Sequence, residues 1–298
     1  MPARWWLALV APIGLTFFAG GLASSRASAQ PNQALLVTTR PPVEQVAPPL
    51  PEPPPAPAPS PEPSRSRSVG RPNVGRLRDG VRLRTGEHVR ARGSHPYGTA
   101  ELVALLERVA ARVRAEHPGG PRLSVADLSG PRGGRIRPHR SHRSGRDADV
   151  GFYLVTEAGE PTEAPGFVNL DSDGCGPHDG ARYCWDGRRN WALIAALAED
   201  STMYVQYVFV ANDLRERLLN EGLRQGASPE LIARVETLTR LRRGSEAHRN
   251  HFHVRIYCPD DDRPLCSDDG PIHPWVVRRP PPRPERARPR RRARRTLR

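Results

Sequence analysis

The 298-residue chain contains no lysine, so arginine supplies every one of its 46 basic side chains. It has no internal repeat, which argues against a repeat architecture. Its N-terminal apolar run, Trp5 to Ala19, is too short for a typical membrane span. No cysteine closely follows that run, which argues against a lipoprotein. A membrane-spanning protein, a lipoprotein and a repeat protein are therefore all disfavoured.

Residues 1–29 have the pattern of an export signal. Arg4 supplies a positive charge before the apolar run, and Ala27-Ser-Ala29 forms an A-x-A cleavage site. We therefore expect cleavage after Ala29 and a periplasmic or exported protein, with an uncleaved anchor as the alternative. Residues 30–67 are expected to form a disordered linker, because their proline-dominated part cannot pack a core. That part is interpreted as a semi-rigid spacer, and a passive leader is the other interpretation.

The net charge of +14 is concentrated at the C-terminus. Residues 278–298 hold eleven arginines and one glutamate, which give +10. A charged block of this kind is typical of a disordered interaction tail. We expect it to bind an anionic envelope polymer, and no nucleic-acid partner, since an export signal contradicts one. Biased composition is the competing explanation for the arginines.

The four cysteines form two close pairs, Cys175 with Cys184 and Cys258 with Cys266. An even count in an exported chain suggests disulfides, and local pairing is the simplest of the three connectivities. A zinc site built from Cys258 and Cys266 is the weaker alternative, because their spacing fits no common zinc-finger pattern.

Residues 68–277 are long enough for one domain with a substantial core. The apolar periodicity predicts helices over 100–117 and 190–198, and a third from an N-cap at Asn212 to Gly222. Ser228-Pro229-Glu230 begins a further helix. Strands are expected over 122–128, 147–155, 203–211 and 250–257, with 203–211 central. The mixed order predicts an α+β fold, with a mainly antiparallel central sheet flanked by helices.

Two histidine-rich segments carry the chemistry. They are residues 139–149, which include His139, His142 and Asp149, and residues 248–253, which include His248, His251 and His253. Neutral imidazoles and a carboxylate are zinc ligands, and a catalytic zinc keeps one open position. Alternate strand residues share a face, so His251 and His253 point the same way.

These patterns predict specific roles. We expect His142, Asp149 and His253 to bind the metal, with His251 positioning or deprotonating the nucleophilic water and His248 assisting it. Solvated histidines in an arginine-rich loop are the alternative.

The chain resembles the penicillin-insensitive murein endopeptidases, which are zinc peptidases of the wider lysostaphin, D-alanyl-D-alanine peptidase and hedgehog group. The group pattern His-x6-Asp…His-x-His is complete here. The closer resemblance rests on Ser68-Val-Gly, Tyr97-Gly-Thr, Asp127-Leu-Ser-Gly-Pro-Arg-Gly-Gly134, His248-x-x-His251-x-His253-Val-Arg and Cys258-Pro…Cys266. It covers about Ser68 to Trp275.

The resemblance implies a zinc ion on His142, Asp149 and His253, with His251 at the catalytic water. It implies cleavage of peptidoglycan cross-links between D-alanine and meso-diaminopimelic acid in the periplasm. It also implies that His139 joins a second zinc near the subunit interface of a homodimer, although residues 171–185 depart from the family pattern. Two alternatives stay open: a D,D- or L,D-carboxypeptidase acting on stem peptides, and a non-catalytic cell-wall-binding module.

Overall fold

An antiparallel pair of strands, β7 (Asp147–Gly151) and β13 (His251–Ile256), lies at the centre of the computed structural model, which describes residues 65–240 and 247–278. They belong to a five-stranded sheet of order β12-β13-β7-β6-β4. The other members are β12 (Val205–Phe209), β6 (Leu123–Val125) and β4 (Val89–Ala91). Within this sheet, β4 and β6 pair in parallel and the other neighbours pair antiparallel. The predicted α+β fold with a mainly antiparallel sheet is confirmed.

Smaller sheets surround this centre. One has the order β10-β11-β8-β9, and the pairs β1-β2 and β3-β5 form two others. Their bounds are β1 (Arg67–Val69), β2 (Arg76–Arg78), β3 (Val81–Arg82), β5 (Tyr97–Gly98), β8 (Leu154–Thr156), β9 (Pro161–Thr162), β10 (Cys175–His178) and β11 (Ala181–Trp185). A short 3-10 helix, η1, spans Asp260–Asp262.

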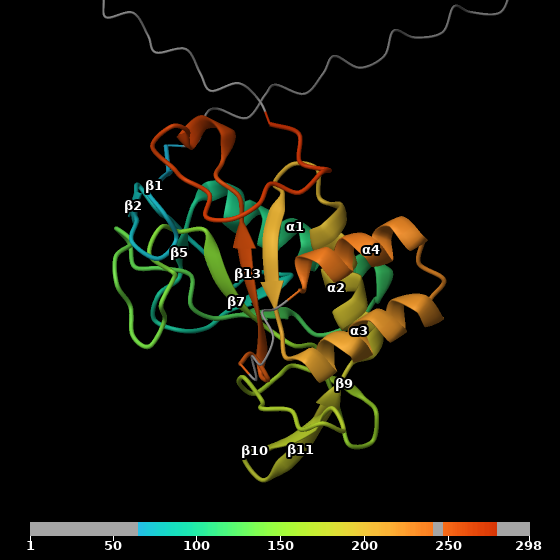
Figure 1. The fold of residues 1–298 in the computed structure, drawn as a ribbon. Coiled ribbons are helices and arrows are strands. Elements are labelled where there is room, and N and C mark those ends of the chain that lie inside the picture. Colours follow the sequence, from blue (N-terminus) through green and yellow to red (C-terminus); the bar gives the residue numbers. More distant parts are fainter. Residues whose placement is uncertain (1–64, 241–246, 279–298) are drawn as a thin grey trace, which may run out of the picture. The chain divides into compact units, whose positions relative to one another are not determined.

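Four helices pack together behind and to the right of the central sheet in the view of Figure 1: α1 (Ala100–Glu116), α2 (Gly187–Glu199), α3 (Asn212–Arg224) and α4 (Pro229–Leu238). Side chains cap three of them, because Thr99, Asp186 and Ser228 accept hydrogen bonds from the first turns of α1, α2 and α4. The predicted helices at 100–117 and 228 onward are thereby confirmed.

Several boundaries differ from the expectation. The predicted strand 147–155 is two strands, β7 and β8, which belong to different sheets. The predicted helix start is also wrong, because Ala211 is the N-cap of α3 and makes no side-chain capping bond. That helix continues past Gly222, where the ring of Trp191 approaches so closely that a Cβ would lie only 2.5 Å from it. Gly222 is thus a packing residue, not a helix terminator.

The strand expected to be central, 203–211, is an edge strand. β12 pairs with β13 on one side only. The segment that follows η1 contacts it, since the Nε2 of His273 lies 2.9 Å from the carbonyl oxygen of Gln206. The ring of His273 also packs edge-on against Tyr207. The apolar sequence of β12 therefore reflects burial under helices and this segment, not a central place in the sheet.

Both local disulfides are present, which confirms the simplest pairing. Cys175 and Cys184 are directly opposite each other in the β10-β11 hairpin, and Cys258 bonds to Cys266. A zinc site at Cys258 and Cys266 is therefore wrong.

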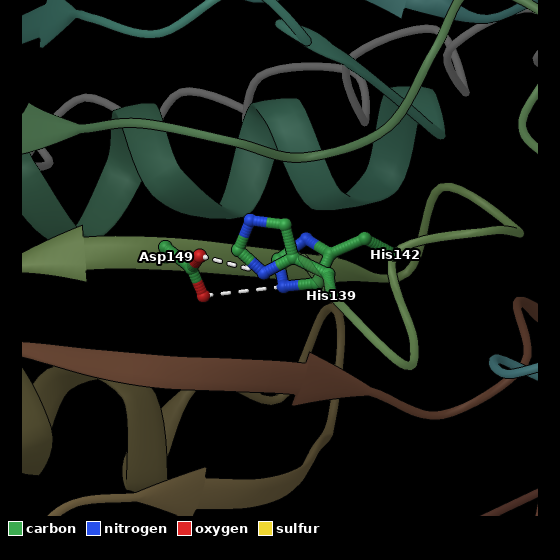
Figure 2. A group of neighbouring side chains, drawn as sticks. All are labelled: His139, His142 and Asp149. Carbon is green, nitrogen blue, oxygen red and sulfur yellow. Dashed lines mark ion pairs between the residues drawn. The ribbon is translucent and has the colours of Figure 1, made fainter. Parts of the chain in front are cut away.

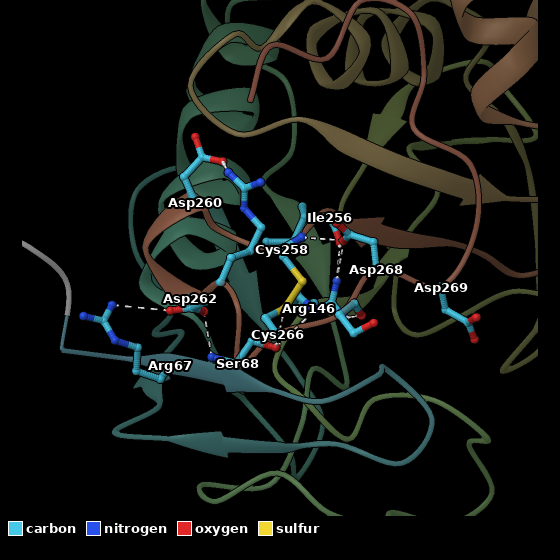
Figure 3. The surroundings of a disulfide bond; sticks show 12 residues. Arg67, Ser68, Arg146, Ile256, Cys258, Asp260, Asp262, Cys266, Asp268 and Asp269 are labelled. Carbon is cyan, nitrogen blue, oxygen red and sulfur yellow. Dashed lines mark hydrogen bonds and ion pairs between the residues drawn. A yellow bond between two sulfur atoms is a disulfide. The ribbon is translucent and has the colours of Figure 1, made fainter. Parts of the chain in front are cut away.

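A fully buried arginine, Arg146, links the loop before β7 to the segment after β13 (Figure 3). Its guanidinium donates to Ser68 Oγ, to the carbonyl oxygen of Ser267 at 2.9 Å and to Asp268 Oδ1 at 3.0 Å. Burial lowers the pKa of Arg146, and the carboxylate of Asp268 opposes that effect. The Arg146–Asp268 ion pair holds in place the segment that follows the disulfide Cys258–Cys266.

Replacing Arg146 by methionine should lower the free energy of unfolding by about 2–4 kcal/mol, because it removes three hydrogen bonds of a buried guanidinium and one of the two arginine partners of Asp268, the other being Arg278. Arg108→Met is the matched control. Arg108 also pairs with an aspartate, Asp200, but its side chain is 39% exposed, so a loss below about 1 kcal/mol is expected. Urea denaturation of the full chain measures both, and equal losses would contradict the role of Arg146.

The predicted signal (1–29), most of the linker (30–67) and nearly all of the tail (278–298) lie outside the described residues. Among the residues that are described, no helix combines the length and apolarity needed to cross a bilayer.

Candidate active site

The register of β7 and β13 places the two halves of the predicted site opposite each other. His253 pairs directly with Asp149, and His251 pairs with Gly151 two positions along. Because alternate strand residues share a face, His251, His253 and Asp149 all lie on one face, while Phe252 and Val150 are fully buried on the other. His142 reaches the same point from the loop that precedes β7.

Three imidazole nitrogens converge on a single carboxylate oxygen. The distances to Asp149 Oδ1 are 3.2 Å from His142 Nε2, 3.1 Å from His253 Nδ1 and 3.3 Å from His251 Nε2. This oxygen is buried, yet it has no hydrogen-bond partner of acceptable geometry. An orphaned buried carboxylate oxygen among nitrogens is the arrangement that a cation satisfies.

The outer nitrogen of each imidazole is occupied, which fixes the tautomer. His142 Nδ1 donates to the carbonyl oxygen of Leu128 at 2.8 Å, and His253 Nε2 donates to Asp147 Oδ1 at 2.9 Å. His251 Nδ1 lies 2.6 Å from Asn250 Oδ1. When the rings are neutral, the inner nitrogens therefore carry lone pairs that face Asp149. Hydrogen bonds of this kind orient metal-binding histidines in many proteins.

The spacing of three donor atoms fits zinc. His142 Nε2, His253 Nδ1 and Asp149 Oδ1 form a triangle with sides of 3.2, 3.1 and 3.2 Å. A tetrahedral zinc with bonds of about 2.0–2.1 Å separates its ligands by about 3.3 Å. Two lone-pair nitrogens this close would repel each other without a positive charge between them. The residues present therefore fit the metal that the sequence predicts.

His139 lies in the same cluster. Its Nδ1 is 3.5 Å from Asp149 Oδ2, its ring packs on that of His142, and its Nε2 is 3.3 Å from Asp127 Oδ2. Ligand atoms of His139, His142 and Asp149 all lie within 4.8 Å of one another, and Figure 2 shows both imidazoles facing the carboxylate. His139 thus lies beside the group around Asp149.

Two candidate ligands of residues 171–185 have partners within that stretch. His178 contacts Asp179, and Asp173 pairs with Arg182. Within residues 65–240 and 247–278, the group around Asp149 is the one cluster of three or more potential ligands.

The electrostatics of the site favour a cation. Burial raises the pKa of the Asp149 carboxyl, but the surrounding imidazoles outweigh burial and hold that pKa well below its usual range. Burial would lower the pKa of His253, yet the carboxylates of Asp147 and Asp149 raise it to about 9, so a bound metal would displace a proton from the inner nitrogen of this ring. Asp147 is also held ionised, since Arg255 donates to it at 2.7 Å. Two buried carboxylates thus create a negative potential where the ligand atoms meet.

His248 lies beside the cluster. Its ring packs against those of His251 and His253, at centroid distances of 5.2 and 5.6 Å. Burial and these neighbouring imidazoles lower the pKa of His248 to about 4, so the ring is neutral at physiological pH. Its Nδ1 is buried without a hydrogen-bond partner in the described structure. His248 therefore offers a neutral imidazole beside the rings of His251 and His253.

Backbone strain coincides with this site. His142 and His248 both have positive φ, 62° and 68°, a conformation that is uncommon for residues other than glycine and costs of order 1–3 kcal/mol. Gly145, in the same loop as His142, also has positive φ, and a Cβ there would lie 2.7 Å from the side chain of Leu77. The loop is therefore held in its shape by packing on β2.

Sequence reasoning missed four residues of the site. Asp147 orients His253, Asn250 orients His251, and Asp127 contacts His139. Phe167 stacks on the ring of His251, with centroids 5.0 Å apart and an interplanar angle of 18°. Strand alternation could have identified Asp147, two residues before Asp149, and Asn250 adjoins His251. Phe167 comes from a distant loop, and no local pattern marks it.

The α+β fold and this donor set define a metallopeptidase-type centre. A family model described as penicillin-insensitive murein endopeptidase matches residues 69–274. The chain belongs to that family.

Curated relatives agree with this assignment. A penicillin-insensitive murein endopeptidase of Haemophilus influenzae is 28% identical over 189 residues, which cover 62% of this chain and 59% of the relative. Proteins of the same name from Yersinia pestis and Citrobacter koseri are each 26% identical, over 59% and 60% of this chain. The match covers less than two thirds of each relative's length. It covers 58% of the Yersinia pestis protein and 59% of the Citrobacter koseri protein.

Proposed function

We propose that the protein is a zinc-dependent murein endopeptidase that hydrolyses the D-alanyl–meso-diaminopimelyl cross-links of peptidoglycan. The observation that carries the proposal is the convergence of three lone-pair imidazole nitrogens on the orphaned Oδ1 of Asp149. The names of the family and of its relatives supply the substrate class.

The residues divide into two roles. His142, Asp149 and His253 would hold the zinc, which when bound lowers the pKa of water and polarises a peptide carbonyl. The Nε2 of His251 lies 3.3 Å from the same oxygen. Asn250 holds its other nitrogen, and Phe167 fixes the plane of its ring. His251 can therefore accept a proton from the nucleophile in a single orientation.

Metal analysis and product masses test the proposal together. The purified chain should contain one zinc at this site and should convert cross-linked dimeric muropeptides to monomers, with activity lost on chelation and restored by zinc. Loss of a terminal alanine instead would indicate a carboxypeptidase. Zinc binding with uncleaved dimers and intact stems would leave a wall-binding module.

The proposal includes an exported location, because the substrate lies outside the cytoplasm. The two disulfides support it, since such bonds persist in oxidising compartments. The second zinc, the homodimer and the anionic polymer bound by the tail stay predictions.

A further inference from the structure

An exposed group of arginines borders the loop that carries the metal-site histidines. It consists of Arg71, Arg76, Arg78, Arg82, Arg84, Arg132, Arg135, Arg137 and Arg140, which we term the arginine patch. Its two segments, 71–84 and 131–140, contain one acidic residue, Asp79. The patch lies in the described domain and is distinct from the C-terminal tail.

Three buried apolar residues anchor the patch. Leu77, Leu83 and Ile136 are 1%, 1% and 7% exposed, and each lies between two exposed arginines in the sequence. Since successive side chains of an extended chain point to opposite sides, each anchor directs its two neighbouring arginines toward solvent. The patch therefore has a fixed backbone beneath it.

The two segments are bound to each other and to the site. Leu77 N–H donates to the carbonyl oxygen of Arg132, and Arg143 N–H donates to that of Pro72. Arg76 also forms a β-bridge with Gly133. Segment 131–140 then runs directly into His139 and His142. The arginine patch is thus continuous with the rim of the metal site.

Pairing separates these arginines from most others. Elsewhere Arg108, Arg122 and Arg249 form ion pairs with Asp200, Glu163 and Asp213. Within residues 65–240 and 247–278, the nine patch side chains form no ion pair or hydrogen bond. Arginine-rich composition explains why arginines are abundant, but it does not explain why nine unpaired ones lie in the two segments that adjoin the loop of His142.

We infer that the arginine patch binds the peptidoglycan strand through the free carboxylates of its peptides, beyond the bond that is cleaved. This inference rests on the proposed function for its substrate. Peptide stems that contain meso-diaminopimelic acid carry several carboxylates, and guanidinium groups bind carboxylates by paired hydrogen bonds. A row of unpaired arginines also concentrates an anionic polymer near the site.

Two double variants test the surface: Arg76→Gln/Arg78→Gln and Arg135→Gln/Arg137→Gln. The matched control, Arg188→Gln/Arg240→Gln, removes the same charge from exposed arginines outside the patch. Each patch variant should weaken co-sedimentation of the full chain with intact sacculi, in the presence of chelator, by about 3- to 10-fold at low salt. The control should bind like the parent, and 0.5 M salt should remove the difference (about a 4 Å screening length).

Digestion of the same sacculi gives the second readout. The patch variants should raise KM by the same factor and leave kcat unchanged. Weakening equal to that of the control, or a fall in kcat alone, would overturn the inference. If removing phosphate-bearing polymers from the sacculi abolishes parent binding, the ligand is phosphate and the carboxylate assignment is wrong. Failure of the parent to cleave sacculi would instead refute the proposed function, while co-sedimentation would still decide the role of the patch.

Discussion

Replacing Asp149 by alanine is expected to remove the zinc and to lower kcat/KM on cross-linked muropeptides by at least about 1,000-fold. The carboxylate supplies the oxygen on which three imidazole nitrogens converge. Without it, two remaining ligands hold the metal weakly. Loss of metal removes several kcal/mol of transition-state stabilisation, and each 1.4 kcal/mol is a factor of ten in rate. Zinc content and turnover of the same samples measure both effects.

Three further aspartate variants make the result specific. Asp173→Ala removes an exposed carboxylate that pairs with Arg182, and it should leave both zinc content and turnover unchanged. Asp147→Asn removes the charge that orients His253, and a loss of about 10- to 100-fold in metal affinity or activity is expected. Asp149→Asn, which preserves volume, shows whether the effect comes from misfolding. An Asp149→Ala enzyme that cleaves dimers as well as the parent would refute the proposed site.

The local part of this site could be predicted from sequence because it depends on short-range geometry. Strand alternation alone places His251 and His253 on one face with Phe252 behind them, and the structure shows this arrangement. The cysteine pairing was predictable for a similar reason, since the simplest pairing closes the shortest loops. The helix at 100–117 follows from apolar spacing and its Thr99 cap.

The features of the fold and site that sequence could not predict depend on contacts between segments distant in the chain. The pairing of His253 with Asp149 needs the register of two strands about a hundred residues apart. The edge position of β12 depends on the segment around His273, which contacts it and has no apolar periodicity of its own. The role of Phe167 depends on a loop between two short strands. The place of His139 beside Asp149 depends on how residues 131–145 pack on β2.

Replacing His251 by alanine should separate catalysis from metal binding. His142, Asp149 and His253 still supply three ligands in this variant, so zinc content should stay near that of the parent. The proton acceptor is lost, however, and kcat should fall by about 100- to 10,000-fold with little change in KM. His253→Ala is the matched comparison on the same face of β13, and it should lose zinc and activity together.

Neighbouring residues refine the assignment of His251. Asn250→Ala removes the acceptor that fixes its tautomer, so a smaller fall in kcat, about 10- to 100-fold, is expected, and Asn250→Asp should restore most of it. His248 does not contact Asp149 in the described structure and is neutral, so His248→Ala should cost less than His251→Ala. If His251→Ala loses its zinc, His251 is a ligand and the water-positioning role falls to His248. Its unpaired Nδ1 would then be the remaining imidazole nitrogen of this segment able to accept the proton.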